Sequence, residues 1–217
     1  VKENHRIYAD VVGYDVEQLV LTEQVHSTNI LRVGKKDTGE VFCPDRSIKE
    51  TDGLVTDEPG VVLMTFFADC VPLMFYDTVK DAVGNAHSGW RGTVQRMGQK
   101  MVEKMQQEFG SCPENMIAVV GPSICQKCYE VSEEVITEFQ NAFDKRYWDD
   151  LFYKKPDGHY QLDLWRANQI ILEEAGVKKE NICVSSLCTN CHPDLLFSHR
   201  FTKGKRGNLA AVIGLRE

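Results

Sequence analysis

Two histidines and one cysteine stand at the ends of apolar stretches of the sequence, namely His26, Cys70 and His87. Burying such polar side chains costs free energy unless they are paired, bound to a metal or used in a reaction. Two imidazoles and one thiolate would suit a catalytic Zn²⁺, which keeps one position open for water or substrate. The gaps of 44 residues (70 − 26) and 17 residues (87 − 70) match no short zinc signature. From spacing alone, satisfied core residues are the alternative interpretation.

A glycine-rich turn spans Ser88 to Thr93, with the sequence SGWRGT. Gly89 and Gly92 allow the backbone to come close to a ligand, and the amide groups at the start of the following helix are unpaired donors. Arg91 adds a planar fork of donors that matches phosphate. We therefore expect an anion site in which Arg91 has a catalytic part and Thr93 contacts the ligand. The alternative is a tight turn with Arg91 in solvent.

Polar neighbours of the three candidate ligands are further candidate site residues. Asp69 precedes Cys70, and in an extended segment its side chain points away from that of Cys70. This favours a role for Asp69 in orienting the site over direct chemistry, although it stays a catalytic candidate. Ser27 and Ser88 could hydrogen-bond a substrate or a water molecule, but a serine at a strand end usually satisfies its own backbone.

Apolar runs and helical patterns alternate along the chain, and these elements must position the candidate residues. Helices are predicted up to Val12, from the Ser88 to Thr93 turn through Phe109, after Ser132, and over about 163–175. Strands are predicted at 19–21, 30–33, 54–56, 61–67, 71–76, 82–87, 116–120, 182–186 and 209–213. Several strands are continuous apolar runs, which predicts sheets covered on both faces in a layered α/β protein.

Composition and charge exclude several classes of protein. The chain has 217 residues and a net charge of 25 − 32 = −7, with 42% hydrophobic residues, which favours a single domain with a sizeable core. An acidic chain is a poor phosphate-backbone binder, and no apolar stretch is long enough to span a membrane, so we expect neither nucleic-acid nor membrane partners. Eight scattered cysteines favour reduced thiols in the cytoplasm. The charge is compatible with a monomer or a homodimer.

Two CxxC pairs form a competing metal hypothesis, Cys125 with Cys128 and Cys188 with Cys191, the second followed by His192. Two such pairs usually suggest structural zinc. Here the pairs are 188 − 128 = 60 positions apart, which is far from the usual spacing. The alternative is that these cysteines are reduced thiols that behave as small hydrophobic residues.

Six motifs occur in an order that resembles one family: QVHST, ADCVPL, AHSGWRGT, GPSICQKCYEV, LDLWRAN and FSHR. This is the laccase-domain, or multicopper polyphenol oxidase, family, whose members are described as purine nucleoside phosphorylases with adenosine deaminase activity. The resemblance implies one domain over residues 1–217 with a four-layer α/β/β/α fold. It also implies that His26, Cys70 and His87 are metal ligands and that Tyr129, in the CYEV element, helps to line the site.

The resemblance further implies a zinc-dependent purine nucleoside enzyme. It would use phosphate to split adenosine, inosine and also methylthioadenosine into base and ribose 1-phosphate, and it would deaminate adenosine. The site would hold Zn²⁺, or Cu²⁺, and its partners would be a purine nucleoside and phosphate. Family members usually begin with a further N-terminal segment that is missing from this sequence, and its true absence would leave one wall of the active site open.

Two other functions stay open at this stage. Copper-dependent oxidation of phenols is implied by the family's older name, but laccase turnover needs several coppers, whereas the sequence has six histidines and no HxH pair. A non-catalytic, metal-stabilised or cell-wall quality-control protein is the third interpretation, and metal removal would then unfold it without any nucleoside being turned over.

Overall fold

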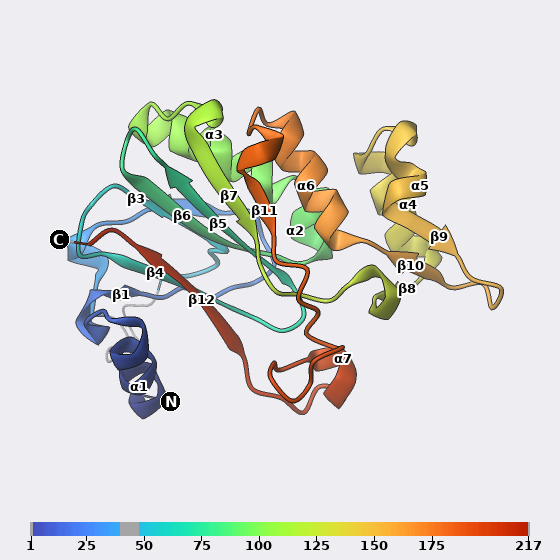
Figure 1. The fold of residues 1–217 in the computed structure, drawn as a ribbon, viewed down its shortest axis with the longest axis horizontal. Helices are drawn as coiled ribbons and strands as arrows, with labels where there is room; N and C mark the ends of the chain where they lie inside the picture. Colours follow the sequence, from blue (N-terminus) through green and yellow to red (C-terminus); the bar gives the residue numbers. More distant parts are fainter. Residues whose placement is uncertain (1, 40–47, 217) are drawn as a thin grey trace.

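A six-stranded mixed sheet lies at the centre of the fold, with the strand order β11-β7-β5-β6-β3-β2 (Figure 1). The computed structural model describes residues 2–39 and 48–216. The strands of this sheet are β2 (Ile30–Arg32), β3 (Gly53–Thr56), β5 (Val71–Asp77), β6 (Ala82–Ser88), β7 (Met116–Val120) and β11 (Ile182–Val184). The central strands are almost entirely buried, as expected for apolar runs that are covered on both faces.

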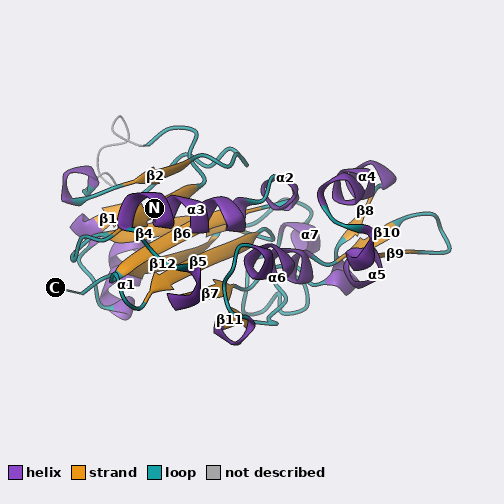
Figure 2. Ribbon diagram, turned by 90° about the horizontal axis from the view of Figure 1, so that it is seen from above, coloured by secondary structure: helices purple, strands orange, loops and turns teal. Residues whose placement is uncertain are grey.

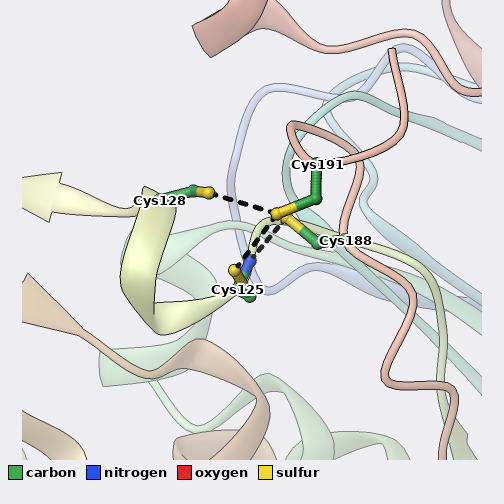
Figure 3. Close-up of side chains that lie close together, drawn as sticks. All are labelled: Cys125, Cys128, Cys188 and Cys191. Carbon is green, nitrogen blue, oxygen red and sulfur yellow. Dashed lines mark hydrogen bonds between the residues drawn. The ribbon is translucent and has the colours of Figure 1, made fainter. Parts of the chain in front are cut away.

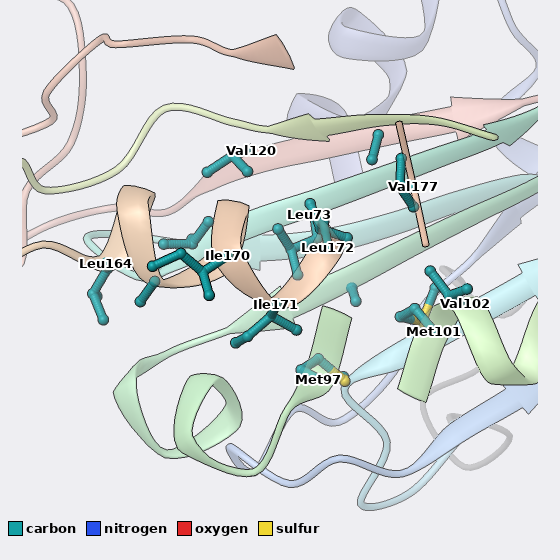
Figure 4. Close-up of a cluster of buried hydrophobic side chains, with 14 of the residues drawn as sticks. Leu73, Met97, Met101, Val102, Val120, Leu164, Ile170, Ile171, Leu172 and Val177 are labelled. Carbon is teal, nitrogen blue, oxygen red and sulfur yellow. The ribbon is translucent and has the colours of Figure 1, made fainter. Parts of the chain in front are cut away.

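Helices cover one face of this sheet: α2 (Trp90–Val94), α3 (Met97–Phe109) and α6 (Leu164–Glu174). Met97, Met101 and Met105 recur at helical spacing in the sequence, and in α3 they are fully buried and form its apolar stripe. Figure 4 shows Met97 and Met101 of this stripe meeting the apolar face of α6 over the sheet, with Ile171 close to Met97. Burial of this face, rather than helix propensity, is the main source of stability for both helices.

A three-stranded sheet covers the other face of the central sheet, in the order β1-β4-β12. Its strands are β1 (Leu19–Val20), β4 (Val62–Phe67) and β12 (Leu209–Gly214). Leu63 packs in one apolar cluster with Leu54 and Val83 of the central sheet. Helix α1 (Lys2–Val12) lies on the outer side of this second sheet, where Tyr8 contacts the apolar cluster of Leu19 and Met64. The order helix, sheet, sheet, helix confirms the expected four-layer α/β/β/α fold.

A third, small sheet lies at one end of the molecule, as Figure 2 shows. It consists of β8 (Glu130–Val131), β9 (Phe152–Lys154) and β10 (Tyr160–Leu162), and it packs against α4 (Glu133–Ala142) and α5 (Trp148–Leu151). The sequence patterns predict none of these strands, because each has only two or three residues and is too short to show alternation. They also miss helix α7 (His199–Thr202), which precedes β12.

The helix predicted from Ser88 through Phe109 is wrong in one respect, because two helices occupy this stretch. Arg96 adopts a left-handed conformation with φ 66°, which ends α2 and begins α3. The interruption turns the chain so that Gly98 packs against Ile171 and Leu172. The predicted end of the helix at Phe109 is confirmed, since Gly110, the next residue, is the left-handed C-cap of α3 with φ 66°.

Candidate metal centre and substrate pocket

The strand connections bring the two histidines and the cysteine together. The chain passes from β4 in the outer sheet to β5 in the central sheet at residues 68–70, so Cys70 lies where the two sheets meet. The register of the central sheet pairs Pro72 with His87, which places His87 beside this crossing. His26 arrives from the loop between β1 and β2. Cys70 Sγ and His26 Nε2 lie 3.9 Å apart.

The three side chains fit a tetrahedral metal ion. Their ligand atoms all lie within 4.8 Å of one another, and the two imidazole rings have centroids 4.8 Å apart at an angle of 78°. A zinc ion bound by nitrogen and sulfur in tetrahedral geometry places those atoms about 3.5 Å apart. His26 is exposed while His87 is almost fully buried, so the ligands close the inner side and leave the outer side open. Such a centre keeps a position for an exchangeable ligand.

Asp52 connects the ligands to the fold, although the sequence analysis did not identify it. Its carboxylate is fully buried and accepts a hydrogen bond from His87 Nδ1 at 2.9 Å. It also accepts from the backbone amides of Val25, His26 and Ser27, and from the Ser27 hydroxyl at 2.9 Å. Because Nδ1 of His87 is engaged by Asp52, Nε2 is the nitrogen left for a metal.

The electrostatics of the centre favour a thiolate. Burial alone would raise the pKa of the Cys70 thiol, but hydrogen bonds and positive charge from the two imidazoles lower it to about 6. Burial likewise would lower the pKa of His87, but hydrogen bonds to the Asp52 carboxylate and to Cys70 raise it to about 9. Both shifts favour a thiolate at Cys70 beside a protonated His87. The thiolate is the form that binds metals.

A cavity of about 580 Å³ opens directly over this centre. Its size lies in the range typical of small-molecule sites. Aromatic side chains on its walls are Phe66, Phe67, Trp90 and Tyr129, and basic side chains are His199, Arg200 and Arg206. The remaining lining residues are Thr22, Gln24, His26, Ala68, Asp69, Cys70, His87, Ile124, Leu164 and Asn208. The cavity thus brings together flat apolar walls, positive charge and a candidate metal centre.

Asp69 lies in the wall of this cavity and holds another part of it in place. Its carboxylate accepts hydrogen bonds from the Thr189 hydroxyl at 2.6 Å and from the Arg200 backbone amide at 2.8 Å. The Arg200 guanidinium in turn donates to the Glu130 carbonyl at 3.0 Å and lies over the Tyr129 ring at 5.4 Å from its centre. Asp69 thereby links Thr189 and Arg200 to the cavity wall, and a role for Asp69 in orienting the site stays a prediction.

Ser88 and Thr93 are buried beneath the cavity floor. Their hydroxyls lie 3.1 Å apart, and Thr93 also bonds the Gly89 carbonyl at 3.0 Å and the Asn168 amide at 3.2 Å. Neither residue is among the lining residues of the cavity, and neither is Ser27, whose hydroxyl bonds Asp52. These three hydroxyls are therefore occupied in holding α2 and the His26 loop.

Gly89 and Arg91 are placed differently from each other. A Cβ atom at Gly89 would lie 3.0 Å from Cys70 Sγ and 3.1 Å from the His26 ring, so the absence of a side chain allows the two ligands to approach. A Cβ atom at Gly92 would meet its nearest neighbour at 3.5 Å, an ordinary contact. Arg91 is exposed and stacks its guanidinium on Trp90 at 4.4 Å from the ring centre, outside the residues that line the cavity.

Similarity to known proteins identifies the family of this chain. The sequence model of the family described as multi-copper polyphenol oxidoreductase laccase matches residues 1–216. The chain belongs to this laccase family. The purine nucleoside phosphorylase YlmD of Bacillus subtilis is 38% identical over 100% of the chain and 78% of its own length. The adenosine deaminase RL5, from an unknown prokaryotic organism, is 34% identical over 87% of the chain and 72% of its own length.

A solved structure of a similar protein has the same fold. The Bacillus licheniformis protein YfiH superposes with a TM-score of 0.95 at 39% identity, covering 100% of this chain and 81% of the other. The fold class and the family that the sequence motifs suggest are thereby confirmed. None of the helices in residues 2–39 and 48–216 is both long enough and apolar enough to cross a membrane.

Sequence reasoning missed three residues of the candidate site. Asp52 precedes a buried strand in the segment TDG, and a carboxylate at the start of such a strand is a signal that could have been followed. Arg200 stands in the FSHR motif, and Arg206 lies in the basic segment just before β12. Their positions depend on the loop between β11 and β12 folding back over the β4 to β5 crossing, and no local pattern predicts that contact.

Proposed function

We propose that this chain is a zinc-dependent purine nucleoside enzyme that splits inosine and adenosine with phosphate and also deaminates adenosine. The observation that carries the proposal is the cavity itself, in which aromatic walls and two arginines surround a His, Cys, His ligand set. Relatives with the names purine nucleoside phosphorylase and adenosine deaminase support the same substrate class. Methylthioadenosine is a further candidate substrate, because the apolar walls suit a nucleoside with a thioether.

The proposed metal ligands are His26, Cys70 and His87. A Zn²⁺ bound there supplies positive charge beside the substrate and lowers the pKa of a bound water molecule. The protein's own part is to hold the ligands in position. Asp52 fixes the ring orientation of His87 and the backbone of the His26 loop, so neither ligand has to reorganise when the substrate arrives.

Aromatic side chains would hold the purine. Phe66, Phe67 and Trp90 present flat apolar surface against which a base can stack, and such stacking is tolerant of base identity. Tyr129 adds a hydroxyl, and burial together with the nearby Cys70 charge raises its pKa above the ordinary value for tyrosine. The hydroxyl therefore stays protonated and can donate a hydrogen bond to a ring nitrogen of the base.

Phosphate would bind at the basic wall of the cavity. Arg200 and Arg206 both line this wall, and within the described part of the chain Arg206 Nε has no hydrogen-bond partner. A guanidinium held in this way matches the geometry of phosphate oxygens. Arg91, the candidate from the sequence, lies at the rim over Trp90 and is the alternative phosphate ligand. The start of the short helix α2 is adjacent to it.

In each of the two reactions, one bond to the substrate forms and another breaks. In phosphorolysis a phosphate oxygen bonds to the anomeric carbon of the ribose, the carbon–nitrogen bond to the purine breaks, and the base takes up a proton. Holding phosphate and nucleoside in one cavity accounts for much of the rate through orientation. In deamination water adds at C6 of adenosine and ammonia leaves, which gives inosine. Both reactions place the purine against the same aromatic walls.

The test is chromatographic analysis of adenosine and inosine incubated with zinc-loaded protein, with and without phosphate. We expect phosphate-dependent release of adenine or hypoxanthine, and inosine formed from adenosine. Cys70→Ala should abolish both, whereas Cys183→Ala, an exposed thiol on β11, should have no effect. No turnover by the zinc-loaded chain, with oxidation of a phenol by the copper-loaded chain, would contradict the proposal and support the oxidase named in the family description. No turnover of either kind, with unfolding on metal removal, would support a non-catalytic protein.

A further inference from the structure

The fold brings together two CxxC pairs that are far apart in the sequence, as Figure 3 shows. One pair flanks the short 3-10 helix Gln126–Cys128, and the other lies in the loop that follows β11. The four sulfur atoms lie within 4.8 Å of one another. We call this group the four-cysteine cluster, and its members are Cys125, Cys128, Cys188 and Cys191.

The spacing of the sulfur atoms matches a tetrahedral metal site. Four thiolates bound to zinc at 2.3 Å in a tetrahedron lie about 3.8 Å apart. The Sγ of Cys191 lies 3.5 Å from that of Cys128 and 4.0 Å from that of Cys125. A disulfide would instead require a separation of about 2.05 Å, and the described cysteines are all free thiols.

Hydrogen bonds join the two loops that carry the cluster and reach one of its sulfur atoms. The two loops are joined by backbone hydrogen bonds, from Ser123 N to the Leu187 carbonyl at 3.2 Å and from Thr189 N to the Ser123 carbonyl at 3.2 Å. The amide of Cys125 donates to Cys188 Sγ at 3.3 Å. An amide hydrogen bond of this kind stabilises a thiolate, which is the form that binds a metal.

We propose that the four-cysteine cluster binds one structural Zn²⁺, in a site separate from the centre formed by His26, Cys70 and His87. A set of four thiolates fills all positions of a tetrahedral zinc ion, so it leaves none for substrate and the site is structural. The four thiols release their protons to solvent as the ion binds. His192 is not part of the group, although the sequence places it next to Cys191.

The location of the cluster explains what the ion would do. Tyr129 follows Cys128 directly in the sequence. The Cys128 carbonyl accepts a hydrogen bond from the Arg200 guanidinium at 3.4 Å. Cys188 is followed by Thr189, whose hydroxyl bonds Asp69. The described stretch between β11 and α7 contains no helix or strand, and it is joined to the loop of Cys125 and Cys128 by the hydrogen bonds of Ser123. A bound ion would fix both loops and thereby the cavity wall that carries Tyr129 and Arg200.

The test is the zinc content per chain after purification under reducing, anaerobic conditions. The double variant Cys188→Ser/Cys191→Ser is expected to bind one zinc ion fewer than the parent chain. The matched control Cys112→Ser/Cys183→Ser changes two exposed thiols outside the cluster and is expected to lose none. The Cys70→Ala chain is expected to keep the cluster zinc, which makes the result independent of the proposed enzyme activity. Equal zinc content in the cluster variant and in the parent would overturn the proposal.

A second measurement needs no cluster variant and so does not depend on that variant folding. The Cys70→Ala chain is loaded with one equivalent of zinc and treated with an alkylating reagent, and modification is mapped by mass spectrometry. We expect the four cluster thiols to be protected at least tenfold relative to Cys112 and Cys183, and the protection to vanish after chelation. Equal modification of cluster and control thiols in the presence of zinc would overturn the proposal.

Discussion

Asp52 Oδ1 lies 2.9 Å from His87 Nδ1, with both side chains buried where strands β3 and β6 pair. The same carboxylate accepts the backbone amide of His26 at 3.1 Å. One buried anion therefore positions two of the three proposed metal ligands, one through its ring and the other through its backbone. These hydrogen bonds compensate for the burial of the carboxylate. Burial raises the pKa of Asp52, but the hydrogen bonds, of which the one from His87 has the largest effect, bring it below its ordinary value.

Replacing Asp52 should weaken metal binding. In Asp52→Asn the side chain loses its charge and one of its two acceptor oxygens, so the imidazole of His87 is less firmly oriented and less basic. We expect zinc affinity, measured by competition with a chromophoric chelator, to fall by about 10- to 100-fold. Asp10→Asn, an exposed position on α1, is the control and should leave the affinity unchanged. An unaltered affinity in a folded Asp52→Asn chain would show that Asp52 has no part in holding the ligands.

The space at Gly89 gives a second prediction. In Gly89→Ala the new Cβ would lie 3.0 Å from Cys70 Sγ, so the thiolate or the helix must shift. We expect the zinc affinity to fall by roughly tenfold or more, as it does when a residue that supports a metal ligand is removed. Gly92→Ala is the matched control three residues along, because its Cβ would meet Ser88 Oγ at an ordinary 3.5 Å. Comparable affinities for the two variants would mean that Gly89 serves only the turn.

Two arginines can be distinguished as phosphate ligands. Arg206→Ala removes a guanidinium from the cavity wall, and a charged hydrogen bond of about 1.5–3 kcal/mol corresponds to roughly a 10- to 100-fold rise in the KM for phosphate. Arg91→Ala removes a side chain that stacks on Trp90 at the rim, and its effect should be smaller. Steady-state kinetics with inosine at varied phosphate compares the two. A larger effect of Arg91→Ala would place phosphate at the start of α2, as the sequence alone suggests.

Asn85 provides a test of the packing between the two sheets. Its amide donates to the carbonyls of Leu63 at 3.0 Å and Ala211 at 2.8 Å, and its oxygen accepts the Thr65 hydroxyl at 2.9 Å. Asn85→Ala leaves these buried groups without partners and should lower the free energy of unfolding by about 2–4 kcal/mol. Denaturant unfolding measures the change, with Asn141→Ala on the exposed side of α4 as control. Equal stability of the two variants would show that the hydrogen bonds of Asn85 do not stabilise the packing between the two sheets.

Long apolar strands and amphipathic helices are the parts of the fold that the sequence predicts well. The runs 61–67 and 71–76 correspond to β4 and β5, and the methionine stripe corresponds to the buried face of α3. Asp69 and Cys70 interrupt the apolar pattern because the chain changes sheets there, and this interruption is itself the signal for the site. In these segments the local sequence pattern correctly predicts where the residues lie in the fold.

Other features depend on contacts between distant segments. The break at Arg96 cannot be seen in a pattern whose apolar period continues across it. The strands of the small sheet pack against α4 and α5, and each strand is too short to be recognised alone. Ser88 and Thr93 have polar side chains that look available in the sequence, but Asn168 of α6 satisfies them in the core. Side-chain hydrogen bonding across the fold therefore decides which candidate residues can face a substrate.

The most direct test of the proposed reaction is the identity of the sugar product formed from inosine. The zinc-loaded chain is incubated with inosine and phosphate in ¹⁸O-labelled water, and the products are analysed by mass spectrometry beside a His87→Ala chain. We predict ribose 1-phosphate in an amount equal to hypoxanthine, without label from water in the sugar, and no product from His87→Ala. Labelled free ribose, or ribose 1-phosphate formed equally well by His87→Ala, would contradict phosphorolysis at the His26, Cys70 and His87 centre.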